Sequence, residues 1–147
     1  MNNKKWIGID FGLKRIGLAI FRDPVAVALP IGVIPCTVHQ KKNIKNILQF
    51  LNAYLPIEKF VIGLPLHLSG EESAMSIAVK KFAVTLQDVS KIPYEFVDER
   101  CTSKMAENIL REGHYSRKRR ANIEDSSSAT IILQTYIDHQ KGMEGLC

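Results

Sequence analysis

The most constraining feature of this sequence is a change in its hydrophobic pattern part-way along the chain. Two short apolar runs, residues 5–10 and 16–21, are joined by a glycine-containing connection, which is typical of a β-hairpin. A third run at residues 31–34 is bracketed by Pro30 and Pro35, which cannot donate to a strand ladder. Beyond it, helix-like and strand-like segments alternate. Such a chain is expected to form an antiparallel meander that parallel strands then extend.

The second part of the chain shows this alternation clearly. Apolar residues recur at helical spacing over residues 44–55 and 75–86, and each of these segments is followed by a short apolar run, at residues 60–62 and 93–97. A strand that follows a helix in this way is added parallel to the sheet through a right-handed crossover. The sequence therefore predicts the α/β class, with a mixed five-stranded sheet (the first three strands antiparallel, then parallel) flanked by helices.

Local signals predict where the remaining helices begin and end. Ser69 and Glu72 have the spacing of a capping box and are expected to open the helix over residues 75–86. A short helix is expected at residues 102–113, and the basic segment after it is expected to form a loop. The last helix is expected to run from about residue 125 to residue 139.

Composition excludes several classes of protein. The 147 residues are 46% apolar and 24% charged, which are ordinary globular values, and they suffice for a single domain over residues 1–147. The apolar runs are short and interrupted by proline or charge, so neither a membrane span nor a secretory signal is expected. The three cysteines, Cys36, Cys101 and Cys147, show no metal-binding spacing. We therefore expect reduced thiols in a cytoplasmic protein.

Basic residues are concentrated in one part of the chain. The formal net charge is +5, from 20 Lys and Arg against 15 Asp and Glu. Residues 100–120 hold seven basic and two acidic residues, and four of the basic residues are consecutive: Arg117, Lys118, Arg119 and Arg120. Such a run favours binding to the phosphate backbone of a nucleic acid. The alternative is a solvated basic loop without a partner.

Two carboxylates stand at the ends of predicted strands. Asp10 ends the first strand and, because side chains alternate along a strand, shares a face with Trp6 and Gly8. Glu99 follows the strand at residues 93–97, at the end where ligands bind in open α/β sheets. Each also has an ordinary explanation, since aspartate is common in turns and Glu99 could pair with a neighbouring arginine.

A third carboxylate, Asp125, precedes the apolar stripe of the last helix. It lies four residues before Ala129, so it is on the side of the helix that faces the core. A carboxylate there either caps the helix N-terminus or meets the two strand-end carboxylates. Carboxylates clustered in this way are ligands for hard divalent cations such as Mg²⁺ or Mn²⁺. Two such ions can activate a water molecule and stabilise the leaving oxygen of a phosphodiester.

Four ordered segments of the sequence resemble one known family. They are DFGLKRIG at residues 10–17, VIGLP at residues 61–65, DERCTS at residues 98–103 and DSSSATIIL at residues 125–133. These segments are similar to motifs of the YqgF family, which is related to the RuvC resolvases, and they span most of the chain. Two positions depart from the family pattern: Cys101 stands where an aliphatic or aromatic residue is usual, and Ser128 where an alanine is usual.

The resemblance implies a fold, an activity and a set of site residues. The fold would be RNase H-like, and the activity that of a divalent-metal nuclease acting on structured RNA or branched DNA. The substrate would be the 5′ end of pre-16S ribosomal RNA, with the Holliday junction as the alternative. The residues that match the family's metal-binding, catalytic carboxylates are Asp10, Glu99 and Asp125. The residues expected to face phosphates are Lys14, Arg15, Arg100 and Thr102.

Asp98 is the neighbour of Glu99 and an alternative to it. Adjacent residues on a strand point to opposite faces, so only one of the two side chains is expected to enter the site. Glu99 is the predicted ligand.

Other interpretations of the sequence follow from the same features. The chain could bind nucleic acid without cleaving it, as a ribosome-assembly factor that uses the basic run. Nucleotide hydrolysis of the actin or Hsp70 type is disfavoured, because the chain is too short for two lobes and holds no P-loop motif. The oligomeric state is open. A junction resolvase is expected to be a homodimer, so that two sites cut symmetric strands. Ile131 and Ile137, expected to be exposed on the last helix, could form the dimer contact or could pack under the basic loop.

Overall fold

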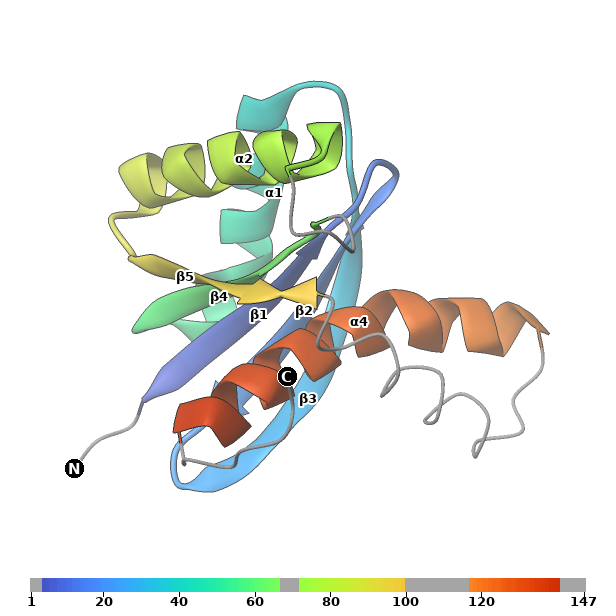
Figure 1. Cartoon of the computed structure of the whole chain (residues 1–147). Helices are drawn as coiled ribbons and strands as arrows, with labels where there is room; N and C mark the ends of the chain where they lie inside the picture. Colours follow the sequence, from blue (N-terminus) through green and yellow to red (C-terminus); the bar gives the residue numbers. More distant parts are fainter. Residues whose placement is uncertain (1–3, 67–71, 100–116, 141–147) are drawn as a thin grey trace.

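A five-stranded mixed sheet lies at the centre of the structure. The computed structural model describes residues 4–66, 72–99 and 117–140 (Figure 1). The strands are β1 (Lys5–Phe11), β2 (Arg15–Arg22), β3 (Val25–Pro35), β4 (Lys59–Leu64) and β5 (Tyr94–Asp98). Their order in the sheet is β3-β2-β1-β4-β5. The pairs β3–β2 and β2–β1 are antiparallel, and the pairs β1–β4 and β4–β5 are parallel, so the predicted meander with two parallel additions is confirmed.

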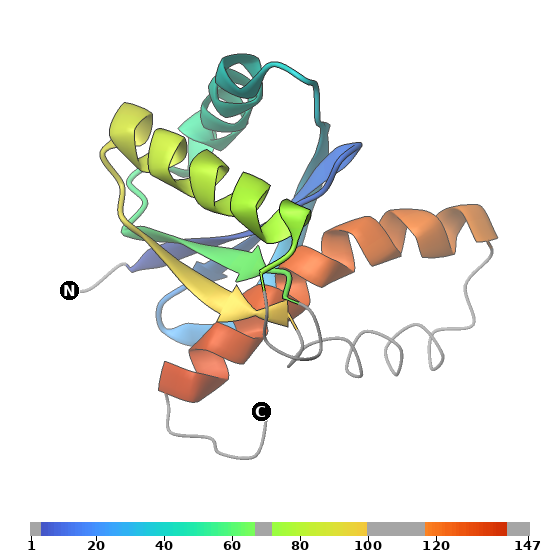
Figure 2. The same ribbon diagram turned by 45° about the horizontal axis from the view of Figure 1, so that its top comes forward.

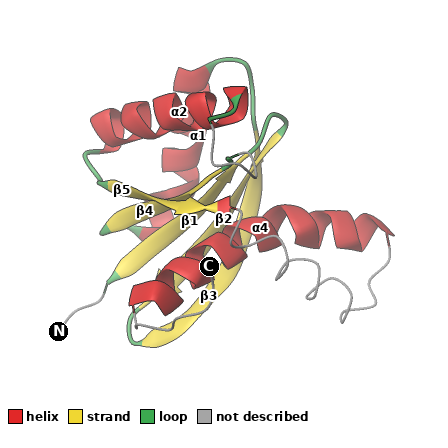
Figure 3. Ribbon diagram, in the orientation of Figure 1, coloured by secondary structure: helices red, strands yellow, loops and turns green. Residues whose placement is uncertain are grey.

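Helices cover both faces of this sheet. Helices α1 (Gln40–Leu51) and α2 (Ala74–Ser90) lie on one face, and α4 (Arg117–Gln140) crosses the other face (Figures 1 and 2). A short 3-10 turn, η1 (Asn52–Tyr54), continues α1. Figure 3 shows the resulting three layers of helix, sheet and helix. None of the helices in the described part of the chain is long and apolar enough to cross a membrane.

Side-chain alternation along β1 divides the core in two. Ile7 and Ile9 are buried on the side of α1 and α2. Trp6 is buried on the side of α4, where its ring meets that of Tyr136 edge-on, with the ring centres 5.2 Å apart. Asp10 lies on the same side as Trp6 because the two are separated by an even number of residues. The strand thus presents Asp10 toward α4, as the sequence pattern predicts.

Strand β3 is longer than predicted, and both prolines lie inside it rather than beside it. The sequence suggests a strand at residues 31–34 alone, because proline lacks an N–H donor. β3 is an edge strand of the described sheet, so one side of its backbone needs no strand partner. A register shift between Leu18 and Ala19 on β2 accommodates Pro30 opposite. Proline marks a sheet edge here, not a strand boundary.

Helix α2 begins later than a helix capped by Ser69 would begin. Its N-cap is Ser73, whose hydroxyl oxygen accepts a hydrogen bond from the Ser76 N–H at 3.0 Å, while the Ser76 hydroxyl oxygen accepts one from the Ser73 N–H at 2.9 Å. The prediction of a capping box at Ser69 and Glu72 is wrong. Glu72 precedes the helix in an isolated bridge with Leu66, and Ser69 lies outside the described residues. A serine at the third helical position replaces the glutamate that the usual pattern requires.

Helix α4 begins earlier than predicted. The basic run expected to form a loop is instead its first turn, and this run consists of Arg117, Lys118, Arg119 and Arg120. Arginine, lysine and alanine are strong helix formers, and neither glycine nor proline interrupts residues 117–140. Asp125 and the three serines that follow it are residue types common at helix N-termini, but here they lie within a longer helix. The short helix expected at residues 102–113 lies outside the described residues.

The expected exposure of Ile131 and Ile137 is also wrong, since they are only 3% and 1% exposed. Helix α4 packs across all five strands, so more of its surface faces the sheet than the single stripe that the sequence suggests. These two residues therefore belong to the core and provide no dimer contact.

Helix α4 rests directly on the backbone of β1 at Gly8. A Cβ atom at Gly8 would lie 2.7 Å from the Cβ of Leu133 and 2.8 Å from the carbonyl oxygen of Ala129. The helix is also tied to the edge strand by Gln134, which accepts a hydrogen bond from the Ala28 N–H at 2.9 Å. The missing side chain at Gly8 thus sets how closely the helix approaches the sheet.

We expect Gly8→Ala to lower the free energy of unfolding by about 1–3 kcal/mol, because the added methyl group overpacks against fixed parts of α4. Urea unfolding followed by Trp6 fluorescence measures this loss. Leu29→Ala, at a residue of β3 that is 56% exposed, is the control and should change stability by less than about 0.5 kcal/mol. An unchanged unfolding midpoint for Gly8→Ala would contradict the close packing of helix and strand.

Candidate active site

The carboxyl ends of the parallel strands β1, β4 and β5 lie at one edge of the sheet. Asp10 is near the end of β1, and Glu99 directly follows β5. Strand β4 lies between them, so the backbones of Asp10 and Glu99 are two strand spacings apart, about 10 Å. Their side chains can meet only across β4.

Gly63 of β4 provides the space in which they meet. A Cβ atom at Gly63 would lie 2.6 Å from Oε1 of Glu99 and would also overlap with Cδ1 of Ile132 on α4. The Glu99 side chain therefore lies over the backbone of β4, between the sheet and α4. A larger residue at position 63 would occupy this space.

The structure places Glu99 rather than Asp98 on the side of α4. Val97 is buried in the part of the core that lies beneath α4, and the side chains of Glu99, two residues later, and of Ile132 of that helix both lie over Gly63. Asp98 is paired with Leu64 of β4, and its side chain belongs to the opposite face. Asp98 and Glu99 therefore lie on opposite faces of the sheet, as the alternation of side chains along a strand predicts.

The surroundings of Glu99 raise the pKa of its carboxyl group to about 7. The largest cause is desolvation, because Glu99 is half-buried and the charged form loses hydration. The negative charge of Asp10 and a side-chain hydrogen bond with Asp10 raise the pKa further, and the charge of Asp98 adds to them. Glu99 therefore keeps its proton to a higher pH than an ordinary glutamate does.

The chemistry of this pair fits a hard divalent cation. Carboxylate oxygens are preferred ligands of Mg²⁺ and Mn²⁺, and a dication would offset the repulsion that raises the pKa of Glu99. The side chains in the described part of the chain form no group of three or more metal-binding residues. Two carboxylates with water and substrate phosphates can nevertheless complete a Mg²⁺ shell.

Helix α4 brings the backbone of Asp125 to the same edge of the sheet. Ala129 rests on Gly8 through its carbonyl oxygen, and Asp125 is one helical turn before Ala129. The N-terminal half of α4 extends past the sheet at the edge where β1 and β5 end (Figures 1 and 2). This is the edge that holds Asp10 and Glu99. The side chain of Asp125 lies outside the described part of the structure.

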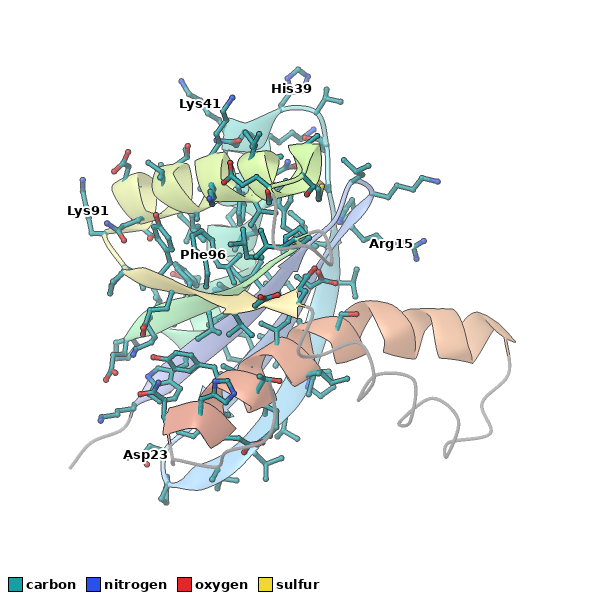
Figure 4. The ribbon with its side chains drawn as sticks, in the orientation of Figure 1. Arg15, Asp23, His39, Lys41, Lys91 and Phe96 are labelled. Atoms are coloured by element: carbon teal, nitrogen blue, oxygen red, sulfur yellow. The ribbon has the colours of Figure 1, made fainter. Side chains whose placement is uncertain are left out.

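The basic residues of the predicted site are only partly described. Lys14 and Arg15 are exposed at the turn that follows Asp10, and Figure 4 shows Arg15 extending away from the sheet. Arg100 and Thr102 lie outside the described residues. The run at residues 117–120 forms the first turn of α4, and its side chains also lie outside the described part.

Sequence reasoning did not identify Gly63 and Ile132 as neighbours of the carboxylates. The available signal is a glycine within a strand that is otherwise apolar and buried, since such a glycine often marks the close approach of another group. Nothing in the spacing of Ile132 distinguishes it from the other apolar residues of α4.

The sequence and the fold are both similar to those of known proteins. A family model described as "RuvX: Holliday junction resolvase" matches residues 4–139. A protein of Protochlamydia amoebophila (strain UWE25) named "Putative pre-16S rRNA nuclease" is 40% identical over 141 residues, which cover 90% of this chain and 91% of that protein. A protein of the same name from Syntrophomonas wolfei is 39% identical over 135 residues, which cover 90% and 92%.

Solved structures share the fold at low sequence identity. RuvC of T. thermophilus, in complex with a Holliday junction substrate, gives a TM-score of 0.56 at 15% identity, covering 95% of this chain and 97% of that chain. A yeast mitochondrial Holliday junction resolvase gives a TM-score of 0.52 at 10% identity, covering 95% and 82%. These likenesses concern the fold, and the RNase H-like architecture expected from the sequence is confirmed.

We expect Glu99→Gln to stabilise the metal-free protein at pH 8 by about 1–3 kcal/mol and to leave its stability at pH 4 nearly unchanged. The pKa of Glu99 is raised in the folded state, so the folded state binds the extra proton between about pH 4.5 and pH 7. The wild-type protein therefore loses stability as the pH rises through this window, and the glutamine variant does not. Urea unfolding in EDTA across this pH range measures the difference.

Glu95→Gln is a control for which the expected change in stability has the opposite sign to that of Glu99→Gln. Hydrogen bonds from Lys59 and from the Tyr136 hydroxyl lower the pKa of Glu95, so its contribution to stability is present above its unfolded pKa and is lost as the pH falls. Its replacement should destabilise the protein at neutral pH. A difference between Glu99→Gln and wild type that does not vary with pH would contradict the raised pKa of Glu99.

Proposed function

The chain belongs to the RuvX family, and on this basis we propose that it is an endonuclease that uses Mg²⁺ or Mn²⁺ to hydrolyse phosphodiester bonds at the 5′ end of pre-16S ribosomal RNA. Membership agrees with the resemblance to the YqgF family that the sequence motifs show. The names of the similar bacterial proteins support the RNA substrate. A protein that acts on this substrate is expected in the cytoplasm.

The observation that carries the proposal is the meeting of Asp10 and Glu99 over Gly63. A half-buried carboxyl group beside a second one is costly for the fold, because burial and the charge of Asp10 both disfavour the ionised form of Glu99. Such arrangements are concentrated at functional sites. A divalent cation is the ligand that turns this repulsion into attraction.

In the proposed site, Asp10 and Glu99 bind the cation from the sheet, and Asp125 binds it from α4. When bound, such an ion supplies an activated water molecule and stabilises negative charge on the leaving oxygen. Glu99 would bind the cation as a carboxylate, so cation binding near pH 7 would displace a proton from it. Gly63 leaves Glu99 the space to turn toward Asp10.

The substrate backbone would be held by the basic residues around this edge. Lys14 and Arg15 follow Asp10 on the β1–β2 turn, and the basic first turn of α4 lies on the part of the helix that extends past the sheet. We propose phosphate contacts for both segments and for Arg100 and Thr102. The expected partner is structured RNA.

A Holliday junction is the second candidate substrate, and the family description favours it. The same carboxylates would cleave DNA, because the chemistry at the phosphate is shared. A resolvase would also require a homodimer, so that two sites cut symmetric strands. The oligomeric state of the active species therefore separates the two candidates.

We expect Asp10→Asn to reduce cleavage by about 100- to 1000-fold, because a lost metal ligand removes several kcal/mol of transition-state stabilisation. Folding should be retained, since the change also removes the repulsion with Glu99. Cleavage is measured with Mg²⁺ or Mn²⁺ on a pre-16S RNA fragment, a four-way DNA junction and a plain single strand. Asp88→Asn, at an exposed carboxylate of α2, is the matched control and should cleave like wild type.

The outcomes of this assay distinguish the alternatives. Preference for the RNA fragment supports processing of ribosomal RNA, and preference for the junction supports the resolvase. Equal cleavage by Asp10→Asn and wild type would refute the proposed site. Binding without cleavage by either protein would indicate a non-catalytic assembly factor.

We expect Gly63→Ala to weaken Mn²⁺ binding and cleavage by about 10- to 100-fold, the usual effect of displacing the groups that orient a ligand. The added Cβ would push Glu99 away from Asp10. Its cost in stability should be smaller than that of Gly8→Ala, because the atoms that it meets are the ends of side chains and can move. Isothermal titration with Mn²⁺ together with urea unfolding tests both statements. A variant that binds Mn²⁺ as wild type does would exclude Glu99 as a ligand.

A further inference from the structure

A groove lies between α1 and α2, on the face of the sheet opposite the candidate active site. Its volume is about 630 Å³, and it is open to solvent. The residues that line it include Lys41, Ile44, Lys45, Leu48, Thr85 and Val89. Because Asp10 and Glu99 face α4 on the other side of the sheet, a molecule in this groove would not compete with substrate.

The shape of the groove follows one stripe of α1. Lys41, Ile44, Lys45 and Leu48 recur at helical spacing, and Asn52 continues the stripe, so the groove extends over about three turns, or about 16 Å. Grooves of this length bind amphipathic helices, whose apolar side chains at positions i, i+4 and i+7 enter them.

The groove has an apolar floor, and a hydrogen bond joins the two helices beside it. Ile44 is buried at its base, and Val89 of α2 remains 57% exposed at its side. Gln40 of α1 donates a hydrogen bond to the Thr85 hydroxyl of α2 at 2.7 Å, which holds the two helices together. The groove is present in the structure without a ligand, and a groove that is already formed favours binding.

The residues that line the groove include two lysines and no acidic residue, and the nearest carboxylate in the sequence of α2 is the exposed Asp88, next to Val89. Helix α1 contains Lys41, Lys42 and Lys45 and no acidic residue. Within the described part of the chain, Lys41 and Lys45 make no ion pair, whereas Lys80 of α2 is paired with Glu72. Figure 4 shows Lys41 projecting from α1 into solvent. A partner that fits this rim carries carboxylates beside its apolar residues.

We propose that the α1–α2 groove binds an amphipathic helix of another protein, with an apolar stripe facing Ile44, Leu48 and Val89 and acidic residues facing Lys41 and Lys45. A nucleic acid would use the lysines but would leave the apolar floor unused. The inference is independent of the nuclease proposal, because the two sites lie on opposite faces of the sheet.

The proposal is tested by selecting helical peptides of about 16 residues for binding to the immobilised full chain. Leucine is fixed along one stripe of each peptide, and the flanking positions vary among glutamate, glutamine and lysine. We expect the selected peptides to be rich in glutamate. Backbone amide shifts in an NMR titration should then change around Ile44, Leu48, Thr85 and Val89.

Charge reversal at two neighbouring lysines supplies the matched control. Lys45→Glu should weaken binding of a selected peptide about tenfold, because Lys45 lines the groove. Lys42→Glu makes the same charge change on the same helix at an exposed residue outside the groove lining and should change affinity less than about twofold.

Several results would overturn the proposal. The selection could yield no binder, or it could yield lysine-rich or glutamine-rich peptides as often as glutamate-rich ones. The amide shifts in the NMR titration could also change on another surface. Loss of RNA binding in Lys45→Glu with unchanged peptide binding would assign this face to nucleic acid. Groove shifts that depend on protein concentration without peptide would assign it to a second copy of the chain.

Discussion

The packing of α4 on the sheet is the contact on which the rest of the structure depends. The helix crosses all five strands and rests on β1 where Gly8 has no side chain to hold it away. Asp125 lies one helical turn before the residue of α4 that contacts Gly8, and Asp10 lies two residues after Gly8 on β1. A helix displaced by one methyl group would alter both the core beneath it and the separation of these residues. Stability and the candidate site therefore share a single geometric requirement.

A second glycine makes the site itself. Gly63 lets Glu99 lie across β4 and form a hydrogen bond with Asp10, although their strands are not neighbours. The fold is less stable for this arrangement, since burial and a nearby carboxylate raise the pKa of Glu99 to about 7. A proton or a divalent cation relieves the repulsion. This conflict between stability and local charge is typical of sites selected for function.

The two faces of the sheet carry different kinds of surface. Beneath α4 the sheet carries a second apolar core, and at the edge where β1 and β5 end it presents the carboxyl groups of Asp10 and Glu99. Beneath α1 and α2 the sheet is sealed by an apolar core, and the outer surfaces of these helices form a groove with an apolar floor and a lysine rim. The candidate active site and the proposed binding groove therefore lie on opposite faces of the sheet.

The sequence by itself determined the hairpin, the mixed sheet and the side of β1 on which Asp10 lies, because these follow from periodicity and alternation along short segments. Its motifs also identified the family. The course of β3 through Pro30, the start of α4 at Arg117 and the burial of Ile131 and Ile137 were decided by tertiary contacts. The course of β3 depends on its position at the edge of the sheet, and the burial of Ile131 and Ile137 depends on how much of the sheet α4 covers. The role of Gly63 was decided in the same way, because a missing side chain has meaning only when the group that fills its place is known.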